Sequence, residues 1–171
     1  GLLDRAESAL RKLESTPYEE EARLALLSIY ERSRDWENAT KIATRLGDSS
    51  QGSFSPRLSH YLCEQAGALT ASGDTVGAIS MLREAAAVSP DSPRPLIDLA
   101  KLQNQLGQPT EALLTLDHLS AAAPQGLPLA ASLLANIALG TGQQVKAMDV
   151  LKASYAQMPS IDLLEAIIKL E

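Results

Sequence analysis

The sequence is poor in the residues that build disulfide frameworks, aromatic cores and membrane spans. Its 171 residues include one cysteine, and aromatic side chains make up only 4% of the chain. One cysteine permits no disulfide within the chain. Residues 119–145 carry no charged side chain, but prolines and glycines interrupt this stretch, so we expect no membrane span in it.

Basic side chains are too few to form an obvious nucleic-acid-binding surface. The chain has 15 lysine and arginine residues against 21 aspartate and glutamate residues, a formal net charge of −6. Nucleic-acid backbones attract clustered cations, so this composition argues against a nucleic-acid partner. The apolar residues, 45% of the chain, are mostly leucine and alanine, which favour helices over strands. We therefore predict an all-α chain.

Two consecutive segments repeat one pattern with a period of 34 residues. The first carries Leu62, Ala66, Leu69, Gly73, Ala78, Leu82, Ala85 and Pro90. At the same offsets the second carries Leu96, Ala100, Gln103, Gly107, Ala112, Leu116, Leu119 and Pro124. The pattern describes two antiparallel helices that turn at a glycine and cross at small residues. A helix-turn-helix unit of this period is the signature of the tetratricopeptide repeat.

Weaker copies of the unit extend over the rest of the chain, so we predict a single right-handed α-solenoid of about ten antiparallel helices. Its parts are a partial repeat at 1–18, repeats at 19–50, 56–91, 92–126 and 127–159, and a capping helix at 160–171. Because the sequence begins inside such a unit, we expect a piece of a longer protein. Extra residues between Gly47 and Pro56 predict an inserted loop, interpreted as a solvated connection rather than a partner contact.

Three polar or aromatic residues near helix starts carry local predictions. Asp35 and Ser92 each precede a predicted helix, and we expect both side chains to cap it. Pro93 suits the first turn of the helix that follows Ser92. Trp36 falls at an inter-helix turn, where we expect its ring to pack across the junction between repeats.

The residues best suited to metal binding or catalysis are His60, Cys63 and Glu64, which share one side of a helical turn. Two or three ligands without a second cysteine pair make a poor metal site. We therefore expect Cys63 to pack as a small apolar group and His60 to form a local hydrogen bond. The sequence predicts no catalytic residues, no bound metal and no cofactor.

In this architecture the first helices of successive repeats line a concave groove, and the faces opposite their packing side receive a partner. Helical spacing assigns to that groove His60, Cys63, Gly67, Arg94, Ile97, Lys101, Asn104 and Asn136. Arg94 and Lys101 suit an acidic peptide segment or a C-terminal carboxylate, and Gly67 leaves room for a ligand side chain. A solvated helix face explains the same residues equally well.

Several runs resemble the lipopolysaccharide assembly protein B family, a bacterial tetratricopeptide family of the inner membrane. They are residues 1–7, 27–30, 35–39 and, most specifically, His60-Tyr61-Leu62-Cys63-Glu64. The resemblance implies a cytoplasmic scaffold within a protein anchored at the inner membrane. The resemblance also implies an adaptor role, in which the protein promotes degradation of the committed-step deacetylase of the lipid A pathway by a membrane-bound protease. The family's N-terminal membrane helix and four-cysteine iron site have no counterpart in this sequence and are not carried over.

Two other interpretations stay open. A generic co-chaperone-like module that binds peptides needs several basic residues converging in one groove, and the chain offers mainly Arg94 and Lys101. An accessory repeat domain of a larger enzyme, such as a glycosyltransferase, needs a catalytic domain outside this sequence. In each case the chain itself is expected to bind proteins and to catalyse nothing.

Overall fold

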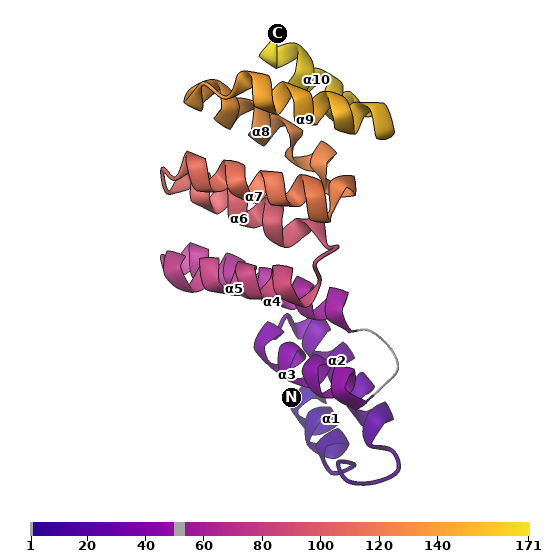
Figure 1. Ribbon diagram of the computed structural model, residues 1–171. Coiled ribbons are helices and arrows are strands. Elements are labelled where there is room, and N and C mark those ends of the chain that lie inside the picture. The colour runs from indigo at the N-terminus through magenta and orange to yellow at the C-terminus, as the bar shows by residue number, and fades with distance from the viewer. Residues whose placement is uncertain (1, 50–53) are drawn as a thin grey trace.

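A computed structural model describes residues 2–49 and 54–171, which form ten α-helices and one 3₁₀ helix and contain no strand. The helices are α1 (Leu2–Arg11), α2 (Glu19–Ser33), α3 (Trp36–Ser49), α4 (Ser55–Ser72), α5 (Thr75–Val88), α6 (Pro93–Gln105), α7 (Pro109–Ala122), η1 (Pro124–Gly126), α8 (Leu127–Thr141), α9 (Gln144–Gln157) and α10 (Ile161–Leu170). Figure 1 shows them stacked into an elongated array, with α1 and α10 near opposite ends.

The helices pack mainly on neighbours in sequence. Within pairs, α2 packs on α3, α4 on α5, α6 on α7 and α8 on α9, and each pair packs on the next. First helices also meet across pairs, because α4 contacts α6 and α6 contacts α8. At the C-terminal end, α10 covers both α8 and α9. The predicted all-α solenoid is therefore confirmed, while the division of the chain into repeats stays a prediction.

Glycines end the first helices of three pairs. Gly73, Gly107 and Gly142 have φ angles of 89°, 73° and 71°, in the left-handed region that glycine enters without steric cost. The turn after α2 uses Arg34 instead, at a φ of 56°. A side chain in this conformation costs roughly 1–2 kcal/mol, so the first complete pair closes with a strained turn.

The core extends along the stack as three apolar clusters, one around α2 and α3, one around α4 and α5, and the largest from α6 to α10. The alanines predicted at helix crossings are between 0% and 4% exposed. These residues are Ala66, Ala78, Ala100 and Ala112 of the two clear copies, with Ala135 and Ala147 at the equivalent positions of the repeat at 127–159. Their burial agrees with the predicted small residues at the crossings of paired helices.

The predicted inserted loop needs correction. The loop predicted between Gly47 and Pro56 is shorter, because α3 continues to Ser49 and α4 begins at Ser55. A single glycine costs a helix only about 1 kcal/mol, which does not end α3 directly after the buried Leu46. The rest of that predicted loop, residues 50–53, lies outside the described residues.

The two predicted caps have different outcomes. Asp35 does cap α3, since its Oδ1 accepts a hydrogen bond from the backbone N–H of Asn38 at 3.2 Å. Ser92 makes no such bond, and its hydroxyl lies 2.8 Å from the hydroxyl of Ser89. A capping side chain accepts from the second or third N–H of its helix, and the third residue of α6, Pro95, has no N–H to donate. In the described residues no helix is both long and apolar enough to cross a membrane.

Enlarging a crossing alanine tests this packing. We predict that Ala100→Leu lowers the free energy of unfolding by about 1–3 kcal/mol, because the added atoms force α6 away from α7. Urea denaturation measures the change, and Ala121→Leu at an exposed position of α7 is the control. Equal stability of the two variants would contradict the assigned crossing.

Candidate partner-binding surfaces

A polar cluster joins α4 to α6, the first helices of two successive pairs. From α6, Arg94 donates to Glu64 Oε1 at 2.7 Å and to His60 Nδ1 at 2.6 Å, both on α4. Its Nε also donates to Asp98 Oδ2 at 3.3 Å. His60 and Glu64 stand one helical turn apart, so both face the same guanidinium. We call His60, Glu64, Arg94, Asp98 and Lys101 the Arg94 cluster.

The charges of the Arg94 cluster balance. Two carboxylates, Glu64 and Asp98, lie beside the cations of Arg94 and Lys101, and Lys101 Nζ is 4.0 Å from Asp98 Oδ1. Burial lowers the pKa of Arg94, but the hydrogen bond to Glu64 and the negative charges around it raise that pKa above its ordinary value overall. The two cations predicted to receive an acidic peptide are therefore already paired. An incoming carboxylate must displace one of the protein's own.

Two residues predicted to line the groove are not available to a partner. Cys63 is 3% exposed and Ile97 is 5% exposed. Cys63 belongs to the core cluster around α4 and α5, while Ile97 belongs to the one that includes α8. In addition to their own partners, α4 packs on α6 and α6 packs on α8, so these first helices have a second packing face. Helical spacing predicted the face of each first helix that packs on its own partner, but not the face that packs on the next first helix.

Cys63 packs in the apolar core, as predicted from its chemistry, and burial also suppresses its reactivity. It raises the pKa of the thiol from 9.0 to about 11, and the opposing effect of the nearby Arg94 is smaller. The thiol is therefore protonated at neutral pH, whereas metal ligation and nucleophilic attack need the thiolate. Among the described residues no group of three or more His, Cys, Asp and Glu side chains is placed to hold a metal ion.

Aromatic contacts position His60 from the preceding pair. Trp36 at the start of α3 stacks on Tyr61 with ring centroids 5.8 Å apart, and its ring meets that of His60 edge to face at 5.6 Å. Tyr61 is 1% exposed, and its hydroxyl donates to Glu31. Trp36 thus packs across the junction between pairs, as predicted. The imidazole of His60 lies between this aromatic contact and Arg94. Its hydrogen bond is therefore to the next pair, 34 residues away, and the predicted local hydrogen bond is wrong.

The remaining predicted groove residues are exposed but do not form one site. A Cβ added at Gly67 would meet nothing within 4 Å, so the space predicted beside this residue is open. Asn104 is exposed near the end of α6. Asn136 on α8 accepts a hydrogen bond from Lys169 on α10, away from the Arg94 cluster. The structure therefore brings together His60, Arg94 and Lys101 and separates Asn136 from them.

A second surface was missed by the sequence analysis. A groove of 590 Å³ lies between the second helices α5 and α7, with α6 as its floor. We call it the α5–α7 groove. A smaller cavity of 180 Å³ lies between α7 and α9, and its lining includes Ser120 and Pro124, one 34-residue period after Ala86 and Pro90. The sequence signal for this groove is the pair Ala86-Ala87, whose short side chains leave the edge of α5 low, whereas second helices were predicted only to pack on first helices.

Paired helices, glycine turns and buried alanine crossings together define a tetratricopeptide-type solenoid. Residues 69–137 match the tetratricopeptide repeat family. Among solved structures, the chain is similar to MamA, with a TM-score of 0.53, 18% identity, and coverage of 98% of this chain and 90% of that one. It is also similar to YrrB, described as a tetratricopeptide protein with an unusual peptide-binding site. That match has a TM-score of 0.51, 16% identity, and coverage of 96% and 82%.

Among curated proteins, the chain is similar to lipopolysaccharide assembly protein B of Escherichia coli strain K12. The two are 29% identical over 119 residues, which is 69% of this chain and 31% of that protein. The proteins of the same name from two further Escherichia coli strains match with the same values. The match thus covers less than a third of the length of these relatives.

The buried thiol generates a prediction about alkaline pH. Because the folded state raises the pKa of Cys63 from 9.0 to about 11, its stabilising effect is complete below pH 9 and is lost as pH rises towards 11. Over that window we expect wild-type protein to lose about 2 kcal/mol more unfolding free energy than Cys63→Ala. Urea denaturation at several pH values measures both, and parallel curves would show that the thiol does not contribute.

Proposed function

We propose that the chain is the repeat scaffold of a non-enzymatic adaptor in lipopolysaccharide biosynthesis, and that the Arg94 cluster lies at its protein-binding surface. The supporting observation is that His60 and Glu64, in the run that resembles the assembly protein B family, both bond to Arg94 in the next pair. The repeat itself needs neither residue. The similarity to the curated assembly protein supports the biological setting.

A partner segment lying across α4 and α6 would meet donors, acceptors and free space together. The side chain of Arg94 is 45% exposed and that of Lys101 is 54% exposed, so solvent and a partner reach both. A partner carboxylate that replaces Glu64 beside Arg94 exchanges one ion pair for another. Such an exchange contributes more to specificity than to affinity. Modest affinity suits an adaptor that holds and then releases its partners.

The partners we propose are a membrane-bound protease and the deacetylase of the lipid A pathway. The adaptor would hold the two together, so that the deacetylase is degraded. In this proposal the scaffold lies in the cytoplasm, and the longer protein that contains it is anchored at the inner membrane. No step needs a cofactor or a catalytic group of this chain, since both reactions belong to the partners.

A generic peptide-binding module is the second candidate function. Its support is the similarity in fold to YrrB, whose description names an unusual peptide-binding site. This candidate predicts binding to peptides unrelated to lipopolysaccharide synthesis. The two candidates differ in the partner, while both use the exposed faces of the repeat helices.

A capture experiment with the full-length protein tests the proposal. We expect His60→Arg and Lys101→Glu each to reduce capture of the protease or the deacetylase by about tenfold, because added bulk or reversed charge disrupts the exposed cluster. Lys146→Glu on α9 is the matched control, since it changes an exposed charge on a second helix. Circular dichroism verifies that all variants are folded.

The opposite pattern would contradict the proposal. If Lys146→Glu abolishes capture while His60→Arg and Lys101→Glu bind like wild type, the first-helix surface is not the interface. If every variant still binds both partners, the interface lies outside the Arg94 cluster. Arg94 itself is a poor test site, because reversing its charge also breaks the bridge between α4 and α6.

A further inference from the structure

The α5–α7 groove differs from the Arg94 cluster in both position and chemistry. Its volume of 590 Å³ lies within the range of pockets that bind ligands in proteins. Leu96 and Leu99 of α6 form part of its lining, and Leu114 of α7 adds a side chain that is 64% exposed. An exposed leucine beside an apolar floor gives a ligand an apolar surface to cover.

The lining of the groove includes a mostly buried side-chain amide whose nitrogen has no hydrogen-bond partner in the described part of the chain. Gln103 is 5% exposed, and its Oε1 accepts a hydrogen bond from the hydroxyl of Thr115 at 2.7 Å. Its side-chain nitrogen donates to no group in the described part of the chain. The nitrogen is not fully buried, so it is open to the groove, where a ligand oxygen can accept a hydrogen bond from it in place of water. The groove therefore offers a fixed donor next to apolar surface.

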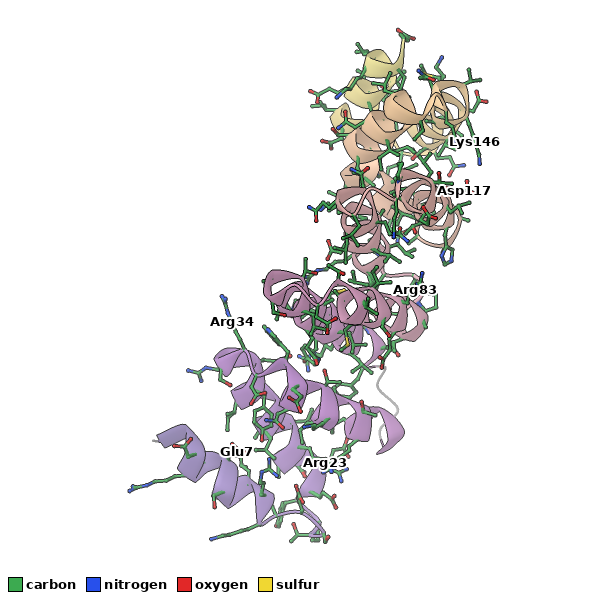
Figure 2. All side chains as sticks on the ribbon, turned by 90° about the vertical axis from the view of Figure 1, so that its left-hand side faces the viewer. Glu7, Arg23, Arg34, Arg83, Asp117 and Lys146 are labelled. Atoms are coloured by element: carbon green, nitrogen blue, oxygen red, sulfur yellow. The ribbon has the colours of Figure 1, made fainter. Side chains whose placement is uncertain are left out.

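Charged groups stand at the edges without partners of their own. Arg83 of α5 lines the groove and forms no ion pair or hydrogen bond within residues 2–49 and 54–171. The side chains of His118 and Glu111 on α7 also line it and likewise bond to none of those residues. Figure 2 shows Arg83 on the same edge of the stack as Asp117 of α7 and Lys146 of α9. The arginine is thus a cation available to a ligand, unlike Arg94.

We propose that the α5–α7 groove binds a peptide segment that presents an apolar side chain and a neighbouring acidic one. The apolar side chain covers Leu96, Leu99 and Leu114, the carboxylate pairs with Arg83, and a carbonyl oxygen of the peptide accepts from Gln103. Glu111 on the other edge disfavours a strongly acidic peptide. One acidic residue next to an apolar anchor is therefore the preferred pattern.

This inference does not depend on the proposed function, because the groove shares no residue with the Arg94 cluster. The cluster lies on the first helices α4 and α6, whereas the groove is lined mainly by the second helices α5 and α7 and uses other residues of α6. A scaffold with both surfaces holds two partners at once. That is the geometry an adaptor requires, and each surface is testable with the other intact.

The test uses random peptides displayed on phage, selected on the whole chain in competition with the soluble variant Ala87→Trp. Ala87 is an exposed residue of the groove lining, so a tryptophan there fills the groove from the α5 side without entering the core. Ala121→Trp is the matched control, because Ala121 stands one 34-residue period later on α7. Isolated peptides are then titrated by fluorescence anisotropy, and circular dichroism checks each variant.

We expect selected peptides to share an aliphatic or aromatic residue next to Asp or Glu. Ala87→Trp should weaken their binding by more than about tenfold and Arg83→Glu by about fivefold, as for loss of an exposed ion pair. Ala121→Trp should bind like wild type. The proposal is overturned if no peptide distinguishes wild type from Ala87→Trp, if selected peptides are basic, or if both tryptophan variants bind equally well.

Discussion

The structure depends on the close approach of paired helices at buried alanines. Ala66 and Ala78 in one pair, and Ala100 and Ala112 in the next, leave almost no surface to solvent at the crossings. A larger residue at these positions would separate the helices and open the apolar clusters on either side. Because a solenoid has only neighbour contacts, each such crossing supports the pairs next to it.

The same stacking creates both candidate surfaces. Neighbouring first helices lie close enough for Arg94 to reach across to His60 and Glu64. The second helices α5 and α7, by contrast, stand apart where α5 carries short side chains, and the α5–α7 groove results. The first helices thus carry a polar surface with balanced charges, whereas the second helices border an apolar groove with an unpaired arginine.

Sequence periodicity predicted the crossings and the turns. It did not predict the environment of the first-helix faces that were expected to line a groove. Ala78 and Gly73 follow from the 34-residue period, because each has a steric reason to recur. The burial of Cys63 and Ile97 does not follow from it, since the contact between successive first helices depends on the angle of stacking. The pairing of Arg94 with Glu64, 30 residues earlier, depends on the same angle. The groove depends on side-chain volumes of three helices together.

The central claim is that alanine crossings hold the array together through neighbour contacts alone. Native-state hydrogen exchange of Ala112→Leu tests it most directly, since it reports the opening free energy of each helix. The account predicts reduced protection in α6, α7 and the helices packed on them, α4, α5 and α8, with α2 and α3 unchanged. An equal loss of protection from α2 to α9 would contradict it, because the whole chain would then unfold as one cooperative unit.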